Sequence, residues 1–142
     1  MQRINVAKVL VRNSDGKYLV LRGSVWPERP DRSQKPDMPG GMVHEGETHT
    51  QGAIREVLEE TGIHLQESDL DLVYADSSLR DNNTKAVTWL LYMATTDTVP
   101  EVKLSWEHEE SWWVSTDELL SLEIRQPYPE IFAYLKKTGV LN

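Results

Sequence analysis

The stretch REVLEETG, residues 55–62, decides how the surrounding sequence folds. A helix turns by about 100° per residue, so the carboxylates of Glu56, Glu59 and Glu60 would fall within an arc of roughly 100°. The opposite side would carry four apolar or small side chains: Ile54, Val57, Leu58 and Thr61. Like charges three and four residues apart repel one another. The pattern therefore predicts a helix with one packed face and one acidic face turned to solvent.

Signals at both ends support this helix. Thr48 and Gln51 have the spacing of a capping box, and Gly62 stands where a helix commonly stops. The acidic face has two interpretations, a solvated surface or a cation site. Carboxylate oxygens are the ligands that hard cations such as Mg²⁺ prefer. The glycine-rich turn PGG at 39–41 and the acid Glu47 lie just upstream and favour the cation site.

The rest of the chain alternates strand and helix patterns. Residues 4–11 and 17–22 are β-rich, and Asp15-Gly16 between them predicts a hairpin. Residues 23–41 lack periodicity and predict a long loop, either functional or disordered. Further strands are expected at 70–76, 86–95 and 111–114, and helices after the capping pair Ser115 and Glu118 and from about 129 to 137. This order predicts one α+β domain, residues 1–142, with a mixed or largely antiparallel sheet.

The composition narrows the classes of function. The chain has 142 residues, no cysteine and a formal net charge of −8. Without cysteine there is no disulfide, thiolate metal site or cysteine nucleophile, which fits a reducing, cytoplasmic location. A nucleic acid polymer is not expected as a partner, because its phosphates need clustered Lys and Arg. We expect no signal peptide, because residues 1–13 lack a long apolar stretch, and no membrane span, because no apolar run approaches roughly 18 residues. A divalent cation would have to supply positive charge for an anionic ligand.

The segment GMVHEGETHTQGAIREVLEETGI, residues 41–63, resembles the Nudix box. That signature reads G, five residues, E, seven residues, R-E, an aliphatic residue, any residue, E-E, any residue, G, an aliphatic residue. Every fixed position is filled here, by Gly41, Glu47, Arg55, Glu56, Val57, Glu59, Glu60, Gly62 and Ile63. The resemblance implies the Nudix fold, an α/β/α sandwich with a mixed central sheet.

The resemblance also implies an activity and a cofactor. Members hydrolyse a diphosphate bond in nucleoside diphosphates linked to another group, with Mg²⁺ or Mn²⁺ bound by the glutamates of the box. By position, Glu56 and Glu59 would be catalytic and would hold the metal together with Glu60 and the main-chain carbonyl of Gly40. The pair formed by Arg55 and Glu47 would support this cluster. Taken alone, Glu47 could equally be a helix N-terminal charge favoured by the dipole.

The loop WEHEE, residues 106–110, is a second candidate region. Many family members carry a glutamate here, before a strand with W-V. The resemblance therefore implies Glu107 as an additional metal ligand or general base, with Glu110 as the second choice. A solvated acidic loop is the alternative. His108 is expected to have a structural role.

Four residues outside the acidic cluster are candidates for substrate binding. Arg22 ends the second strand, where relatives often place an arginine that meets phosphate, although a surface charge is the alternative. Gly40 and Gly41 belong to the approach to the box, in which Pro36 stands where the family usually has an aromatic residue. Trp26, in the same loop, could stack on a base instead, or it could simply pack.

The substrate is expected to be a small nucleotide containing a diphosphate. The marks of ADP-ribose and dinucleoside polyphosphate hydrolases are absent downstream of the box, at residues 78–81. By elimination we favour a nucleoside triphosphate, oxidised forms included, cleaved to monophosphate and pyrophosphate. ADP-ribose, dinucleoside polyphosphates and nucleotide sugars remain alternatives, as does a non-catalytic nucleotide-binding module. The protein is expected to be a monomer or a homodimer.

Overall fold

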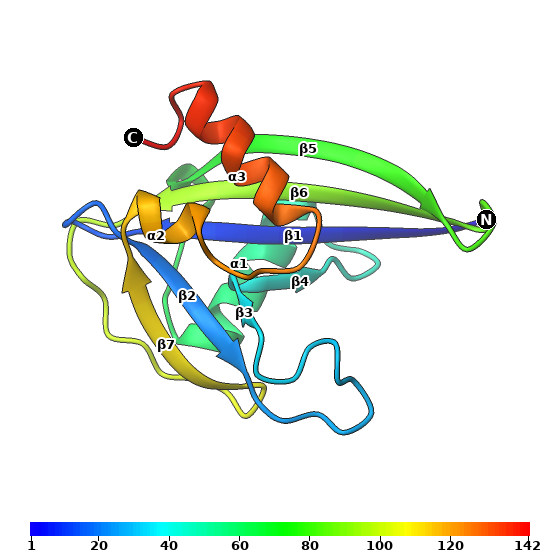
Figure 1. The fold of residues 1–142 in the computed structure, drawn as a ribbon, viewed down its shortest axis with the longest axis horizontal. Coiled ribbons are helices and arrows are strands. Elements are labelled where there is room, and N and C mark those ends of the chain that lie inside the picture. Colours follow the sequence, from blue (N-terminus) through cyan, green and yellow to red (C-terminus); the bar gives the residue numbers. More distant parts are fainter.

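The sheet is organised around its first strand, β1 (Gln2–Arg12), in a computed structural model that describes residues 1–142. β1 pairs in parallel with β6 (Lys85–Thr95) along the whole length of both strands, from Gln2–Lys85 to Arg12–Thr95. All other pairings are antiparallel, so the sheet is mixed. It has seven strands in the order β3-β2-β1-β6-β5, with β4 also paired to β1 and β7 to β2 (Figure 1). The remaining strands are β2 (Tyr18–Gly23), β3 (Pro36–Asp37), β4 (Gly40–Met42), β5 (Leu70–Arg80) and β7 (His108–Val114).

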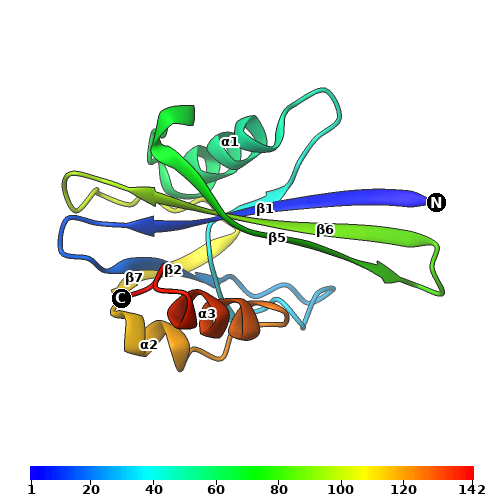
Figure 2. The same cartoon turned by 90° about the horizontal axis from the view of Figure 1, so that it is seen from above.

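Helices cover both faces of this sheet. α1 (His49–Thr61) lies on one face, and α2 (Thr116–Leu120) and α3 (Tyr128–Lys137) lie on the other (Figure 2). A short 3₁₀ helix, Glu67–Asp69, leads into β5. The predicted α/β/α sandwich with a mixed central sheet is confirmed.

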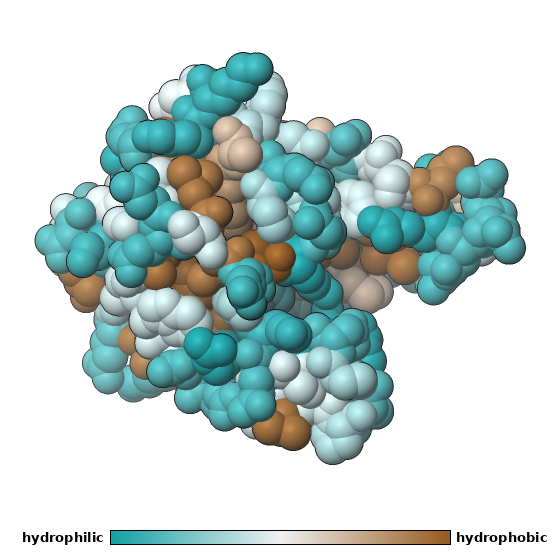
Figure 3. All heavy atoms as spheres, in the orientation of Figure 1, coloured by the Kyte–Doolittle hydropathy of each residue, from teal (hydrophilic) through white to brown (hydrophobic).

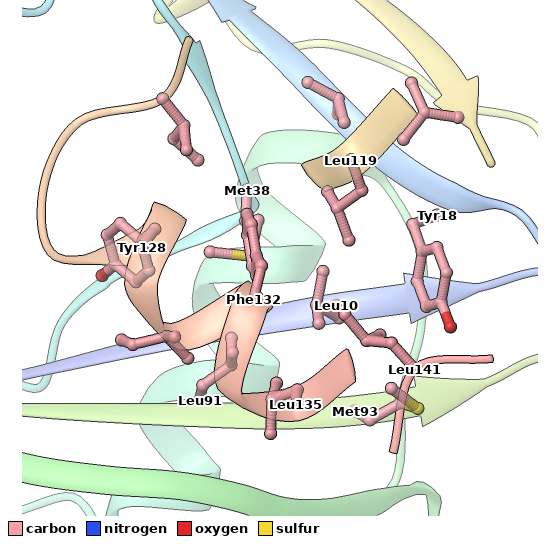
Figure 4. Packing of buried hydrophobic residues seen from close by; sticks show 14 residues of the cluster. Leu10, Tyr18, Met38, Leu91, Met93, Leu119, Tyr128, Phe132, Leu135 and Leu141 are labelled. Atoms are coloured by element: carbon pink, nitrogen blue, oxygen red, sulfur yellow. The ribbon is translucent and has the colours of Figure 1, made fainter. Parts of the chain in front are cut away.

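Successive side chains along each strand point to opposite faces of the sheet, so a separate hydrophobic core forms on each face. On the α1 side, Val9 and Leu19 join Ala53 and Val57 of the helix. The neighbouring side chains of the strands point the other way and pack against α2 and α3, where Phe132 is fully buried. Figure 4 shows this second core, which includes the following side chains besides Phe132: Leu10, Met38, Leu91, Met93, Leu119 and Leu135.

Two predictions about the N-terminal half need correction. β1 and β2 do pair next to the Asp15-Gly16 turn, but the register holds only at Arg12–Tyr18, and further along the same edge β1 pairs with β4 instead. The predicted structureless loop 23–41 contains β3 and the start of β4. These short strands pair with β2 and β1 and bring Gly40 against the centre of the sheet.

The strand expected at 70–76 extends to Arg80, into the segment predicted as a loop. Ser77 to Arg80 pair with β6, which leaves only a tight turn between the two strands. Asp81, Asn82 and Asn83 adopt positive φ angles of 51°, 53° and 66°. Asp and Asn tolerate this conformation better than other residues with a side chain, so the polar composition encodes the turn itself.

The helix boundaries follow the predicted caps. The Thr48 side chain accepts from the Gln51 N–H while the Gln51 side chain returns to Thr48, and Gly62 ends α1 with φ of 75°. The pair Ser115 and Glu118 forms the same reciprocal box before α2. No helix is long and apolar enough to cross a membrane. The face shown in Figure 3 is mainly hydrophilic, with apolar atoms in separate patches.

Candidate active site

The acidic helix face is only partly exposed to solvent. Glu59 is exposed, with 55% of its side-chain surface accessible, and Glu56 retains 15%. Glu60 is buried at 2%, so the prediction that it lies on the solvent face is wrong. The buried side of α1 runs through Val57 and extends to Glu60, about 60° further round the helix. Leu58, predicted on the packed side, is instead 38% exposed.

The backbone at Gly40 explains how a buried carboxylate is tolerated. The Gly40 N–H donates to Oε2 of Glu60 at 3.1 Å. Gly40 has a φ of +133°, and a Cβ there would come within 2.2 Å of the Ala7 carbonyl oxygen. At Gly41 a Cβ would come within 2.9 Å of the Glu56 carboxylate. Gly40 therefore lets β4 pack closely against β1, and Gly41 leaves room for the Glu56 carboxylate beside β4, which a side chain would prevent.

Arg55 ties the acidic groups together. Its Nε and Nη2 donate to Oε2 and Oε1 of Glu47 at 3.1 and 2.8 Å, a bidentate ion pair. Its Nη1 donates to Glu56 at 3.2 Å and to Glu59 at 3.3 Å. Nη2 also donates to the Met42 carbonyl at 3.1 Å. The guanidinium lowers the pKa of Glu47 to about 2 by hydrogen bonding, so this carboxylate stays ionised and holds Arg55 in position.

Lys8 is a central residue of the site that sequence reasoning missed. It lies in the middle of β1, 3% exposed. Its ammonium group donates to Oδ2 of Asp37 and to the carbonyls of Met38 and Gly40, each at 3.1 Å. Lys8 thus fixes the β3–β4 segment against the sheet. The signal was available, since INVAKVLV places one charged residue at the centre of an apolar strand.

These elements border a cavity of about 210 Å³. It is lined by six of the expected residues: Glu56, Glu60, Glu107, Gly40, Gly41 and Trp26. Glu107 reaches it from the loop before β7, so sequence positions far apart meet here. Glu59, Glu47 and Arg55 do not line the cavity.

Burial and crowding shift the acidity of the lining groups. Burial, with repulsion from Glu56 and Asp37, raises the pKa of Glu60 to about 8, although Lys8 and the Gly40 N–H oppose the shift. The pKa of the Glu107 carboxyl is also raised, first by desolvation and then by Glu56 and Glu59. Ionising these carboxyl groups together is therefore costly unless a cation binds among them.

His108 fills the space behind Glu60. Its Nε2 lies 3.7 Å from Oε1 of Glu60, and burial lowers its pKa to about 4, so the ring is neutral at pH 7. The Nδ1 atom is buried without a hydrogen-bond partner.

Divalent cations fit this donor set by chemistry. The cavity offers carboxylate oxygens of Glu56, Glu60 and Glu107 beside the main chain of Gly40, and oxygen is what Mg²⁺ and Mn²⁺ take. No three His, Cys, Asp or Glu side chains already stand in an arrangement that could hold a metal ion. Glu59 points to Arg55 in the structure, so its recruitment would require a rotation of its side chain.

The structure does not bring Arg22 to the cavity. Its Nε donates to Glu110 at 2.9 Å, its Nη1 donates to the Gln34 carbonyl at 3.0 Å, and its guanidinium lies 4.9 Å from the centre of the Trp112 ring. Arg22 and Glu110 thus form an ion pair on the surface of β2 and β7, and neither residue lines the cavity.

Trp26 lies at the cavity wall and stacks on a second tryptophan. The ring centroids of Trp26 and Trp106 are 5.4 Å apart, with 19° between their planes. Trp106 is 77% exposed. This pair gives the cavity an aromatic border of the kind that can stack on a flat ring.

Comparison with known proteins agrees with the geometry. The NUDIX domain family matches residues 1–135. The chain belongs to the NUDIX family. A MutT-like protein of Streptomyces ambofaciens is 34% identical over 92 residues, which make up 65% of this chain and 51% of that protein, so the match spans about half of the relative's length.

Solved NUDIX structures share the whole architecture. The MutT protein of Methanosarcina mazei Go1 is 30% identical with a TM-score of 0.76, and the match covers 97% of this chain and 96% of that one. The Nudix hydrolase RenU of M. smegmatis, at 19% identity, shares the fold with a TM-score of 0.77 over 99% of this chain and 88% of its own. The family match and the MutT relatives indicate a Nudix hydrolase.

Proposed function

We propose that this NUDIX protein is a pyrophosphohydrolase that depends on Mg²⁺ or Mn²⁺. Its substrates would be nucleoside triphosphates, oxidised forms included, cleaved to monophosphate and pyrophosphate. The observation that carries the proposal is the buried carboxylate of Glu60, beside Glu56 and Glu107 in one cavity. Ionising a buried carboxyl group is costly, as the raised pKa of Glu60 reflects, and a cation bound among these groups would offset that cost.

The cation would be held by the carboxylates of Glu56, Glu59 and Glu60 and by the Gly40 carbonyl, with Glu107 either a further ligand or the general base. When bound, Mg²⁺ or Mn²⁺ neutralises phosphate charge and lowers the pKa of a coordinated water.

The protein's own side chains would position the metal ligands and accept a proton from the attacking water. Arg55, fixed by Glu47, would restrain Glu56 and Glu59 before substrate enters. Glu107 has no side-chain hydrogen bond or ion pair within the protein, and its raised pKa suits a group that accepts a proton from the attacking water. Glu107 is therefore our choice of general base, with Glu59 and Glu56 as the alternatives.

Product analysis by chromatography tests this proposal. Purified protein with Mg²⁺ would be incubated with nucleoside triphosphates, oxidised nucleotides, ADP-ribose and dinucleoside polyphosphates, beside Glu56→Gln and Glu107→Gln variants. We expect monophosphate and pyrophosphate from a triphosphate, with loss in Glu56→Gln of at least about 100-fold. Turnover in excess chelator would remove the metal from the mechanism. Binding without turnover of any compound would favour the non-catalytic module.

Other substrates of the same chemical class are outcomes of that assay. Solved structures with this fold include an Ap4A hydrolase of C. elegans at 20% identity and the NUDIX domain of Shewanella oneidensis NrtR complexed with ADP ribose at 12% identity. At these identities the likeness is one of fold alone. Single-domain organisation, a cytoplasmic location and a monomeric or homodimeric state stay predictions.

A further inference from the structure

The cavity has a basic wall that the acidic site does not use. Arg32 and Lys35 reach it from the loop after β2, and Arg125 reaches it from the loop between α2 and α3 (Figure 1). The side chains of Arg32 and Lys35 make no hydrogen bond or ion pair. Arg125 has only a long contact, 4.0 Å from its Nη2 to Oδ2 of Asp37. Three cationic side chains therefore face one cavity with almost no anionic partner.

The acids nearby already have other partners. Asp37 accepts a hydrogen bond from the Lys8 ammonium at 3.1 Å. Asp31 accepts hydrogen bonds from Nε and Nη2 of Arg29, each at 3.3 Å. Glu107 lies in the same cavity but within 4.0 Å of no cationic nitrogen. The protein thus leaves the positive charge of the basic wall unpaired.

Arg32 is the most constrained of the three. It is half-buried, and its Cζ lies 5.9 Å from the centre of the Trp26 ring. Desolvation, followed by repulsion from Arg125 and Arg29, lowers its pKa. Keeping the Arg32 guanidinium charged costs free energy because it is desolvated and lies near other cations. A bound anion would offset this cost by attracting the guanidinium.

The ligand chemistry follows from the groups present. Guanidinium groups present a planar fork that matches phosphate oxygens, and a lysine adds a point charge. The acidic wall would take phosphate through a cation, whereas the basic wall can take phosphate directly. A polyphosphate chain could contact both walls at once, but a compound with a neutral sugar at the far end could not.

Building on the proposed function, we propose that Arg32, Lys35 and Arg125 form a subsite for the terminal phosphates of a polyphosphate chain. This subsite selects nucleoside triphosphates over nucleotides whose diphosphate ends in a neutral sugar.

The direct test is binding of inorganic pyrophosphate, measured by calorimetry with chelator present so that no metal contributes. We compare the wild-type protein, Arg32→Gln/Arg125→Gln, Lys35→Gln and the control Arg80→Gln. Arg80 is an exposed arginine of β5 that does not line the cavity, and its replacement lowers the net charge by one, as Lys35→Gln does, whereas the double variant lowers it by two. We expect Kd to rise at least about tenfold in the double variant and less than about twofold in the control. No binding by wild-type protein, or equal weakening in the control, would overturn the subsite.

Steady-state kinetics distinguish the proposed phosphate subsite from the proposed hydrolase activity on which it rests. In the double variant KM for a triphosphate should rise at least about tenfold, while KM for ADP-ribose stays within about twofold. Equal changes for both compounds would refute the selectivity. If wild-type protein binds pyrophosphate but hydrolyses nothing, the hydrolase proposal fails and the subsite stands. If hydrolysis persists with an unchanged KM in the double variant, the subsite fails and the hydrolase stands.

Discussion

Lys8 offers the sharpest test of how the site is held together. Replacing it by Met keeps the length and apolar stem but removes the ammonium that donates to Asp37, Met38 and Gly40. Breaking a buried ion pair by removing one partner costs about 3–5 kcal/mol. The Asp37 side chain is 20% exposed and still has Arg125 at 4.0 Å, so it would not be left fully buried and unpaired. We therefore expect the lower end of this range, a loss of about 3 kcal/mol in the free energy of unfolding.

Urea unfolding followed by circular dichroism measures this loss. With slopes of about 1–3 kcal/mol/M, the midpoint should fall by about 1–3 M. Lys17→Met is the matched control, because Lys17 is exposed in the turn after β1 and should change stability by less than about 0.5 kcal/mol.

A double variant isolates the cause. In Lys8→Met/Asp37→Leu neither charge is left alone, so the loss should be smaller than in Lys8→Met by itself. The reasoning is refuted if Lys8→Met costs no more than Lys17→Met, or if the second substitution deepens the loss additively.

Three further predictions follow from the helix face. Val57→Asp puts a charge at a fully buried position and should prevent stable folding; a melting temperature like that of wild-type protein would contradict the packed face. Glu59→Gln, at an exposed position, should keep the melting temperature within a few degrees while turnover falls at least about 100-fold, and unchanged turnover would exclude Glu59 from the reaction. In metal-free protein, the pKa of Glu60 rises from 4.5 to about 8 on folding, so between these pH values the native state holds more protons than the unfolded state and stability falls as pH rises. Thermal melts in chelator should show this slope in wild-type protein and a flatter one in Glu60→Gln; equal slopes would rule out Glu60 as the titrating group.

Local signals in the sequence predicted local structure well. The caps of α1 and α2 involve residues three apart, so their side chains meet whatever the rest of the chain does. The pairing of β1 with β6 could not be read in the same way, because it joins residues more than 80 positions apart. The turn signal at Asp15-Gly16 correctly marked a reversal but could not say that β1 would continue beside another strand.

Charge was the less reliable guide at the site. A carboxylate normally belongs on the surface, and helix geometry placed Glu60 on the acidic face with Glu56 and Glu59. Its carboxyl group is stabilised by the Gly40 N–H and by attraction to Lys8, which come from other strands. The basic wall was missed for the same reason, because Arg32 and Arg125 meet only when two distant loops are brought together.

The parallel pairing of β1 and β6 has a consequence for how the chain reaches this state. Everything from β2 to β5, including α1 and its glutamates, lies within the connection between these two strands. During synthesis β1 must wait for residues 85–95 before its longest partner exists. Closing so long a connection slows folding, because chain entropy is lost before the contacts form. We therefore expect the acidic cluster to assemble late, after β6 has paired, and a ribosome-bound chain that ends before β6 to lack an organised site.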